Sequence, residues 1–543
     1  MTRRVVASFL VACVAVATVG CAGQSVVPDP AAEAPTPQQT PRTPSGPVLG
    51  PEPAPDDYAQ SDGIKIATFL GDAHRRTYGR GPVPERLDLV WRARIGSGQT
   101  GGPGGTLVTW SGTGWTGQPT VVREGGRDYL LIGGYDHNLR RVDAETGETV
   151  WTYAFPDVIK GTNTVFAPPG ARGPEDYIVV AGSRRGLGLA MGNPLIAPLR
   201  AVTFASGEEL WRLPVPRTRS YSQDADASAL ALHGRLYVAV ESGYVYGLEP
   251  TATAEWEGGF RRPQVIAQSP VLYTEQDAVR HGGNLVLESS PCVLGTTLYI
   301  AAGSGHVYGL DLEDLSIVWD FYIGSDLDGT VVATTDGHLL VAVEKQYIPG
   351  SGGVFKLDPR KPPAEAVVWY YPTEDRGVSE WLGGVIGSVA VNDASDPERR
   401  RPPLAAFNSV DGYLYVVSQD LVDGVTSGPN LEPDLPQPVL VHRHYIGAAI
   451  STPLIVDDTI VVAGYDGKVR LLSVIARPAG EDADTDGDGV LLRGRDGEWY
   501  TVRVEERASF SGGGSFESTP IVWNGRVYIG SRDGYLYCLG VVE

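Results

Sequence analysis

The chain has 543 residues, with 44 Lys and Arg against 65 Asp and Glu, and its formal net charge is −21. This acidic balance, with no basic stripe, argues against nucleic acid as a partner. A content of 69 Gly, 41 Pro and 42% hydrophobic residues excludes a disordered or collagen-like chain and predicts a folded body with many turns.

The first 21 residues have the features of an export signal. Arg3 and Arg4 precede an apolar run, Val5–Val19, that is too short to span a membrane comfortably. The segment Thr18-Val19-Gly20-Cys21 resembles the lipobox of bacterial lipoproteins, although Thr stands where that family usually has Leu. The resemblance implies a signal peptide over residues 1–20, lipidation of Cys21, and a body anchored to the periplasmic or extracellular face of the bacterial cell envelope. An ordinary cleaved signal peptide is the alternative, and both predict export.

Residues 21–57 are rich in Pro, Ala, Gln and Thr and have almost no aromatic residues. Such a segment cannot bury enough apolar surface to offset its ordering entropy. We therefore expect a disordered, semi-extended tether between the anchor and the body. Residues 58–86 are expected to form a lead-in segment, and residues 87–543 the folded body.

The body consists of one unit repeated eight times. In each copy an alternating strand is followed by a turn, often Asp-Gly or Ser-Gly, and then by a second alternating strand. Many copies have a further apolar segment before them and a short strand with a Trp after them, which makes the four strands of a propeller blade. The copies are Tyr129–Val142, Tyr177–Val202, Arg235–Leu248, Thr297–Leu310, His338–Leu357, Leu404–Val417, Thr459–Leu472 and Arg526–Leu539.

The last copy has no fourth strand of its own before the chain ends at Glu543. An unmatched strand of the right kind lies at Leu87–Arg94, near the other end. We therefore predict an all-β, eight-bladed propeller of four-stranded antiparallel blades, closed by this N-terminal strand joining the C-terminal blade. Such closure leaves no sheet edge exposed.

The segment Val142–Trp151 is similar to the A-x-D-x-x-T-G-x-x-x-W docking motif of pyrroloquinoline-quinone (PQQ)-type propeller repeats. The resemblance covers about Ile66 to Glu543. It implies that Trp side chains near the ends of the units stack between neighbouring blades, as blade-docking residues. These are Trp91, Trp151, Trp211, Trp256, Trp319 and Trp369.

The superfamily that this resemblance indicates, quinoprotein alcohol dehydrogenase-like, contains both enzymes and non-catalytic proteins. Its dehydrogenases bind PQQ and calcium on the ring axis, and the alcohol-oxidising branch usually has adjacent cysteines under the cofactor. The chain has no adjacent cysteines, and the catalytic and calcium-binding residues of those enzymes match no position in it. Other members are non-catalytic, such as the lipoprotein scaffold of outer-membrane β-barrel assembly.

These differences favour a non-catalytic scaffold that is tethered to the membrane by its N-terminal lipid. Its body is expected to be a monomer that binds an envelope protein, a peptide or a small envelope ligand through its loops. Two alternatives remain: a PQQ- and calcium-dependent quinoprotein dehydrogenase of small alcohols or sugars, and a carbohydrate or cation sensor.

The loops that lead into the first strand of several units carry acidic residues. In propellers these loops crowd around one mouth of the central channel, so their carboxylates would focus negative potential and attract a cation or a basic peptide. Trp115 and Trp381 in comparable loops would stack on a planar ligand. The alternative is a set of solvated loop charges. The charged residues are Lys160, Asp224, Asp226, Glu288, Asp326, Asp328, Glu380 and Glu517.

One further motif points to a metal. Asp484, Asp486 and Asp488, followed by Gly489, match positions 1, 3, 5 and 6 of a calcium-binding loop. Position 12, which should be Glu, is Arg495. The segment is therefore either a structural calcium loop or a solvated acidic insertion. Calcium is the one cofactor that the residues themselves suggest, and PQQ is not excluded.

Overall fold

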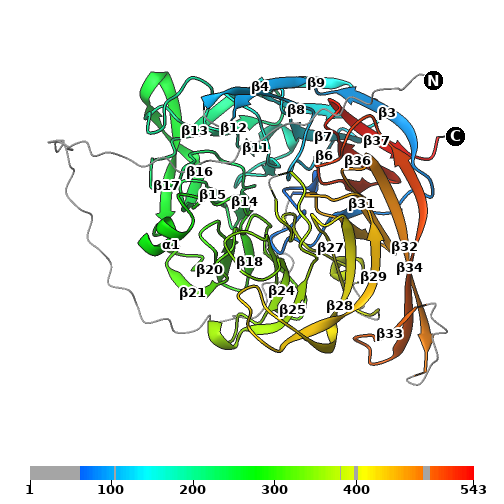
Figure 1. Ribbon diagram of the computed structural model, residues 1–543. Coiled ribbons are helices and arrows are strands. Elements are labelled where there is room, and N and C mark those ends of the chain that lie inside the picture. Colours follow the sequence, from blue (N-terminus) through cyan, green and yellow to red (C-terminus); the bar gives the residue numbers. More distant parts are fainter. Residues whose placement is uncertain (1–60, 103–104, 380, 397–400, 481–488, 543) are drawn as a thin grey trace, which may run out of the picture.

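The computed structural model describes residues 61–102, 105–379, 381–396, 401–480 and 489–542. Eight sheets stand as blades around a central axis, and the chain passes once around the ring, from blue through green and yellow to red (Figure 1). The prediction of an all-β, eight-bladed propeller is confirmed. No helix among the described residues is long and apolar enough to cross a membrane.

The first four blades follow the chain order, with the innermost strand first. Blade 1 has β6 (Thr120–Glu124), β7 (Arg127–Gly133), β8 (Asn138–Asp143) and β9 (Thr149–Ala154). Blade 2 has β10 (Thr164–Phe166), β11 (Ile178–Ala181), β12 (Leu199–Thr203) and β13 (Glu209–Leu213). Blade 3 has β14 (Leu230–Leu232), β15 (Arg235–Val240), β16 (Tyr244–Trp256) and β17 (Phe260–Gln268), followed by the short helix α1 (Glu275–Arg280). Blade 4 has β18 (Cys292–Leu294), β19 (Thr297–Ala301), β20 (His306–Asp311) and β21 (Ile317–Tyr322).

The last four blades include longer outer strands. Blade 5 has β22 (Val332–Ala333), β23 (Leu339–Val343), β24 (Gly353–Leu357) and β25 (Val367–Pro372). Blade 6 has β26 (Ala390–Val391), β27 (Leu404–Asn408), β28 (Tyr413–Thr426) and β29 (Leu435–Tyr445). Blade 7 has β30 (Leu454–Val456), β31 (Thr459–Ala463), β32 (Lys468–Ala479), β34 (Trp499–Ser511) and, at its edge, β33 (Val490–Arg493). Blade 8 has β35 (Ile521–Trp523), β36 (Arg526–Gly530) and β37 (Tyr535–Gly540).

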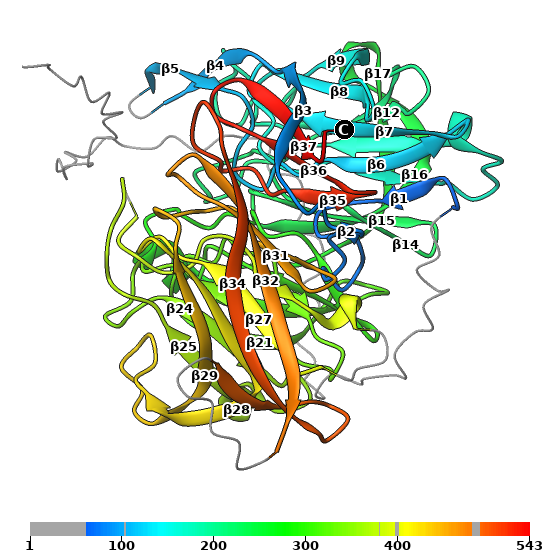
Figure 2. The ribbon, with the colours of Figure 1, turned by 90° about the vertical axis from the view of Figure 1, so that its right-hand side faces the viewer.

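Blade 8 is completed from the other end of the chain. Strand β3 (Asp88–Arg94) pairs antiparallel with β37, from Asp88 opposite Gly540 to Arg94 opposite Tyr535. Figure 2 shows the blue β3 beside the red β37. The predicted closure by an N-terminal strand is confirmed. Two further short strands were not predicted: β1 (Ile64–Ile66) extends blade 1 beside β6, and β2 (Gly79–Arg80) pairs in parallel with β35.

The segment between β1 and β2 crosses the centre of the ring. Backbone N–H groups of Val165, Val293 and Ala333, on blades 2, 4 and 5, donate to carbonyls of this segment at 2.8–3.0 Å. The Thr68 hydroxyl bonds to Ala229 O in blade 3, and the Tyr78 hydroxyl accepts the backbone N–H of Val391 in blade 6. A segment that touches nearly every blade must lie at the axis, where it fills the channel.

Five Trp side chains link neighbouring blades. The indole N–H of Trp151 donates to Phe204 O (2.9 Å), and that of Trp369 donates to Gln419 O (2.8 Å). Trp91, Trp211 and Trp319 make the same bond to Ala144, Pro250 and Lys361. Each acceptor belongs to the next blade, so every indole fixes one blade against another.

Trp256 departs from the prediction. It ends β16 at the far tip of the hairpin with β17, opposite Phe260. The position that holds Trp319 in blade 4, opposite Gly309, is Ala267 opposite Gly247 in blade 3. The third strand of blade 3 runs on past the usual turn, so the Trp at its end lies outside the interface between blades.

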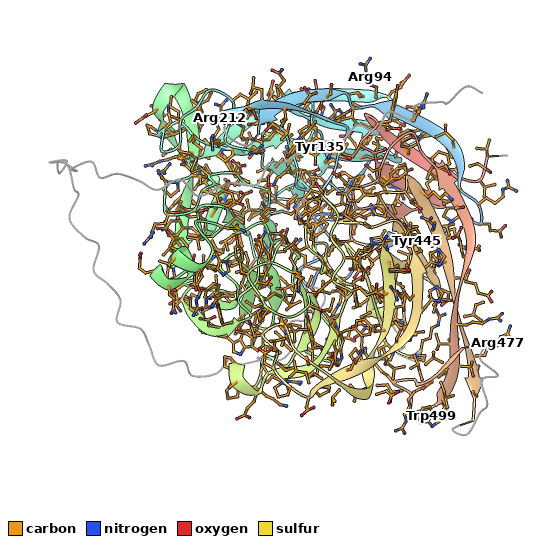
Figure 3. All side chains as sticks on the ribbon, in the orientation of Figure 1. Arg94, Tyr135, Arg212, Tyr445, Arg477 and Trp499 are labelled. Atoms are coloured by element: carbon orange, nitrogen blue, oxygen red, sulfur yellow. The ribbon has the colours of Figure 1, made fainter. Side chains whose placement is uncertain are left out.

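Long hairpins extend from blades 3, 6 and 7 beyond the ring. Strands β28, β29, β32 and β34 run down together from the body in Figure 2. Trp499 and Arg477 lie at the outer end of this extension (Figure 3). A separate hairpin, β4 (Ser97–Gly101) and β5 (Leu107–Ser111), lies outside the blades and contacts the mouth of the channel described below.

Candidate functional site

A ring of hydroxyl groups positions the start of each innermost strand. The backbone N–H of Ser228 donates to Ser290 Oγ, Ser290 donates to Thr330 Oγ1, and Thr330 donates to Ser388 Oγ, each at 2.9 Å. The chain of bonds continues through Thr452 and Thr519, and Gln118 N donates to Thr162 Oγ1. Because each blade is bonded to the next at this level, the residues just before the ring have fixed positions around the mouth.

The residue two positions before each hydroxyl forms one layer of the mouth. In blades 2 to 5 this layer is charged, and in blades 6 and 7 it is apolar. The layer consists of Lys160, Asp226, Glu288, Asp328, Ile386, Ile450 and Glu517, in blade order from blade 2.

A second layer comes from the turn after the second strand of each blade. In every blade this residue lies five positions after one particular residue of the second strand. In blade 3 that residue is Leu236, which pairs with Leu248 of the third strand. The equivalent pairs in the other blades are set by the same register. The layer consists of Tyr135, Arg184, Glu241, Gly303, Glu344, Val410, Tyr465 and Arg532.

The two layers give the mouth an acidic side and an apolar side. Blades 3 to 5 contribute the carboxylates, whereas Ile386, Val410 and Ile450 of blades 6 and 7 form an apolar cluster with Trp115. The mouth encloses a cavity of about 400 Å³. Tyr135, which lines it, lies toward the inside of the ring in Figure 3.

Six of the predicted binding residues line this cavity, and they come from blades that are far apart in the sequence. They are Trp115, Glu288, Asp326, Asp328, Trp381 and Glu517. Asp226 is buried beside the cavity, and Lys160 lines it. Asp224 does not line the cavity and is paired with Arg184, whose Nε donates to it at 3.0 Å. Glu380, the acidic loop with Asp484, Asp486 and Asp488, and Cys21 lie outside the described residues.

The first of two carboxylate clusters holds an ammonium group. One oxygen each of Asp226, Glu241 and Glu288 lies within 4.8 Å of the others. Lys160 forms ion pairs with Asp226 and, at 3.4 Å, with Glu288. Burial lowers the pKa of Lys160, but the charges of Asp226, Glu288 and Glu241 outweigh it and raise the pKa well above its ordinary value. The lysine therefore neutralises part of a buried acidic cluster.

The second cluster is Asp326, Asp328 and Glu344, with the same spacing of at most 4.8 Å. Neither Asp326 nor Asp328 forms an ion pair with a Lys or Arg within the described ranges. Burial and the charge of Glu344 raise the pKa of Asp326 well above its ordinary value, and burial and Asp326 do the same for Asp328. Without a cation, this cluster therefore holds protons at pH values where a solvated carboxyl is ionised.

Asn284 joins the second cluster. Its Nδ2 donates to Asp326 and, at 3.3 Å, to Gln346 Oε1, and these two acceptors fix the orientation of the amide. Its Oδ1 has no hydrogen-bond partner in the part of the chain that the structure describes, and neither has Asp326 Oδ1. Both oxygens face the same space, because a Cβ on Gly303 would lie 2.9 Å from Asp326 Oδ1 and 3.2 Å from Asn284 Oδ1.

Aromatic rings stand around the charged groups. Arg532 bonds to Glu517 (2.7 Å) and lies over the Tyr135 ring, 4.9 Å from its centroid. Tyr221 is 58% exposed. Desolvation of its phenol, followed by the charges of Glu288, Asp326, Glu241 and Asp328, raises the pKa of that phenol, which therefore keeps its proton. Tyr221 thus offers a hydroxyl donor and an aromatic surface next to carboxylates of both clusters.

Several of these residues could have been found in the sequence. Glu241 and Glu344 occupy a position that is Tyr, Arg, Gly or Val in other units, so aligning the eight copies residue by residue would have singled them out as its two carboxylates. Asn284 lies in the irregular segment after α1, and no repeat pattern points to it. Its role follows only from the folded structure.

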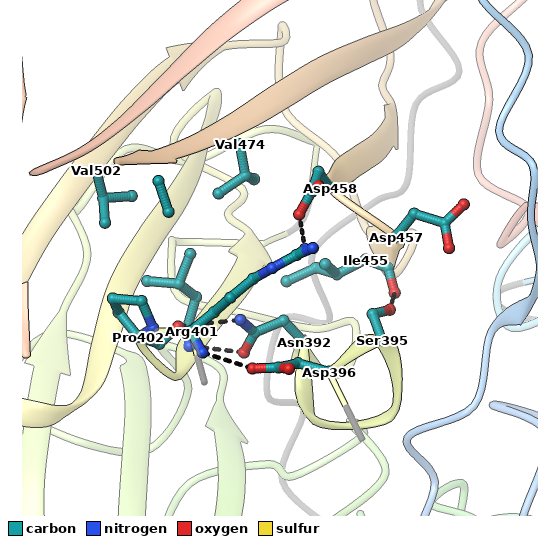
Figure 4. A pocket seen from close by; sticks show the side chains of 12 residues that line it. Asn392, Ser395, Asp396, Arg401, Pro402, Ile455, Asp457, Asp458, Val474 and Val502 are labelled. Atoms are coloured by element: carbon teal, nitrogen blue, oxygen red, sulfur yellow. Dashed lines mark hydrogen bonds and ion pairs between the residues drawn. The ribbon is translucent and has the colours of Figure 1, made fainter. Parts of the chain in front are cut away.

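Another cavity lies between blades 6 and 7 (Figure 4). It has a volume of only about 20 Å³, which holds no more than a water molecule. Arg401 fills much of it, with an ion pair to Asp458 and a backbone bond to Asp396. We therefore regard this cavity as a packing feature rather than a ligand site.

Sequence and structure comparisons bear on the fold. Residues 197–391, a little over a third of the chain, match the family model described as outer membrane protein assembly factor BamB. No curated protein sequence matches the chain.

Two solved structures illustrate the likeness. BamB from Moraxella catarrhalis is similar over 83% of this chain and 100% of its own, with 14% identity and a TM-score of 0.45. Quinohemoprotein alcohol dehydrogenase from Comamonas testosteroni is similar over 90% of this chain and 82% of its own, with 12% identity and a TM-score of 0.53. The chain thus contains a segment, residues 197–391, that matches a PQQ-type repeat family model, and its propeller fold is similar to that of the quinohemoprotein alcohol dehydrogenase.

Proposed function

We propose that this protein is a non-catalytic scaffold, anchored to the bacterial cell envelope through Cys21, that binds an envelope protein, a peptide or a small ligand at the mouth of its channel. The observation that carries the proposal is an open mouth on a ring of eight blades. The segment between β1 and β2 fills the axis, while the loops of eight blades converge on a cavity of about 400 Å³ lined by carboxylates and aromatic rings.

The likeness of residues 197–391 to an outer membrane assembly factor supports a scaffold role. The matched segment includes blades 3 to 5, which supply both carboxylate clusters. The signal-like N-terminus and the Pro-rich segment support an exported body held away from a membrane.

The residues of the mouth do not fit PQQ. PQQ carries three carboxylates, and a site for it needs free cations. Lys160, Arg184 and Arg532 are already paired with Asp226, Asp224 and Glu517. A tricarboxylate would face the remaining acids, so electrostatic repulsion opposes its binding. Calcium, in contrast, matches the oxygen-rich character of the second cluster and is tested below.

Capture of a partner from envelope extract tests the proposal. We expect wild-type protein and the control Tyr445→Ala, which changes an exposed residue of β29, to recover the same partner. The double variant Tyr221→Ala/Trp381→Ala should lose it, because both side chains line the mouth. Loss with Tyr445→Ala and retention with the double variant would place binding on the outer strand of blade 6, near Tyr445, instead. Dye-linked oxidation of alcohols or sugars by the protein with PQQ and calcium would overturn the scaffold role.

A further inference from the structure

The two carboxylate clusters in the mouth are alike in part. Each has three oxygens within 4.8 Å of one another; the first cluster comes from blades 3 and 4, and the second comes from blade 5 alone. Glu241 and Glu344 come from the same position of the second layer, and Asp226 and Asp328 from the same position of the first. Lys160 supplies an ammonium group to the first cluster, and no described Lys or Arg forms an ion pair with Asp326 or Asp328 in the second.

The spacing of the second cluster fits an ammonium group. Three atoms no more than 4.8 Å apart always leave a point within about 2.8 Å of all three, and this is the donor–acceptor distance of a charge-assisted N–H···O bond. An ammonium group has three N–H donors, which matches three converging acceptors. The Lys160 cluster shows that this protein accommodates such a group among carboxylates of this spacing.

A second observation points to a donor ligand at the same place. Asn284 is only 6% exposed, lines the cavity, contacts Asp326 and leaves its Oδ1 without a partner in the described part of the chain. A buried acceptor without a donor costs free energy, which a ligand N–H would recover. A carbonyl oxygen beside carboxylates selects a cation or donor and disfavours an anion.

The rest of the cavity suits a ligand with a carbon chain. Tyr221 and Tyr347 flank the second cluster, and their exposed rings offer faces for a cation or a methylene chain. Tyr347 has a positive φ of 62°, a conformation that is found mostly where surrounding structure imposes it. On the far side of the mouth, Ile450 and Trp381 provide apolar contacts.

We propose that Asp326, Asp328, Glu344 and Asn284 bind the primary ammonium group of an alkylamine, whose chain lies toward the apolar side of the mouth. The group belongs either to a lysine side chain of a protein partner or to a free amine. This inference rests on the proposed function and specifies the chemistry of its ligand. It differs from a metal site because the cavity is far larger than an ion and has Ile450 and Trp381 on its far side.

Titration calorimetry of the body with n-hexylamine tests the inference. Hexan-1-ol, which has the same chain without the charge, and calcium chloride serve as comparison ligands. We expect hexylamine to bind and hexanol not to bind. Asp326→Asn should weaken hexylamine binding by about 10- to 100-fold, the effect of losing one charge-assisted hydrogen bond. The matched control Asp423→Asn, at an exposed site on β28, should bind as the wild type does.

A peptide with one central lysine, and the same peptide with norleucine, identify the source of the amine. Tighter binding of the lysine peptide than of hexylamine assigns the site to a protein partner, and the reverse assigns it to a free amine. Calcium binding that Asp326→Asn abolishes and that hexylamine does not displace would overturn the inference, as would hexylamine binding unchanged in that variant. If the envelope partner is still captured in either case, the scaffold function stands and only the amine site fails.

Discussion

At the level of single residues, the channel mouth concentrates acidic groups whose pKa values are shifted in one direction. Burial and the charge of Glu344 raise the pKa of Asp326 well above its ordinary value. The folded protein therefore binds more protons than the unfolded chain once the pH exceeds about 4, the range in which a solvated Asp ionises. The contribution of Asp326 to the free energy of unfolding is therefore largest at low pH. It falls by about 1.4 kcal/mol for each pH unit between the pKa of Asp in the unfolded chain and the raised pKa in the folded protein.

Asp326→Asn should remove this dependence, since the amide is neutral at every pH. We expect the melting temperature of the variant to equal that of the wild type near pH 4 and to exceed it increasingly toward pH 8. Asp423→Asn should show no such divergence. A difference that stays constant from pH 4 to 8 would contradict the prediction. The titratable groups that interact with Asp326 are Tyr221, Glu288, Asp328, Glu344 and Tyr347, and Lys160 acts on the neighbouring Asp328.

The sequence was sufficient to place some of these residues and not others. Asp326, Asp328 and Glu288 precede an apolar strand in a repeated unit, so their place at one end of the channel follows from the repeat. The division into two clusters does not, because it depends on which loop carboxylates come close in the fold: the first cluster joins blades 3 and 4, and the second lies within blade 5. The Lys160 ion pairs likewise join blade 2 to blades 3 and 4, at distances that no local pattern encodes.

At the level of elements, the contacts between blades depend on individual indoles. Trp369 is fully buried and bonds to Gln419 O of the next blade, whereas Trp256 lies at the tip of a hairpin. Trp369→Ala should cost about 3–5 kcal/mol of unfolding free energy, from lost packing and an unpaired carbonyl. Trp256→Ala should change it by less than about 1 kcal/mol. Urea unfolding followed by tyrosine and tryptophan fluorescence measures both, and equal effects would contradict the assigned positions.

The hairpins of the eight units were predictable because alternation and turn glycines are local signals. The length of the outer strands was not. The third strand of blade 3 continues from Gly247 to Trp256 through Leu248–Glu255, although this stretch contains Pro250, which ordinarily marks the end of a strand. A Trp near the expected end of a unit was therefore assigned to the blade interface, although the register places Ala267 there.

At the level of the whole molecule, the N-terminal part of the body both closes the ring and fills its axis. The lead-in segment was expected to precede the fold, but it bonds to the innermost strands of several blades. Arg75 shows how it is fixed: the guanidinium is fully buried and donates to Pro291 O, Phe69 O and Thr68 Oγ1. The sequence could not reveal the place of the lead-in segment, because most hydrogen bonds of the segment join backbone carbonyls and N–H groups, which carry no sequence signal.

Closure by β3 predicts that the ring unfolds cooperatively. Successive N–H groups of a strand point to opposite sides, so one of Arg92 and Ala93 must donate a hydrogen bond to β37. The double variant Arg92→Pro/Ala93→Pro removes that bond, because Pro has no backbone N–H. We expect this variant to lose at least about 2 kcal/mol of unfolding free energy and to melt over a broader range, because an open ring exposes the edge of blade 8. Arg261→Pro/Arg262→Pro breaks the exposed tip of the β16–β17 hairpin by the same chemistry and should leave the main transition in place. Scanning calorimetry of the wild type and the two variants tests this prediction. If the β3 variant melts like the control variant, β3 does not close the ring, and the lead-in segment alone holds the ring closed.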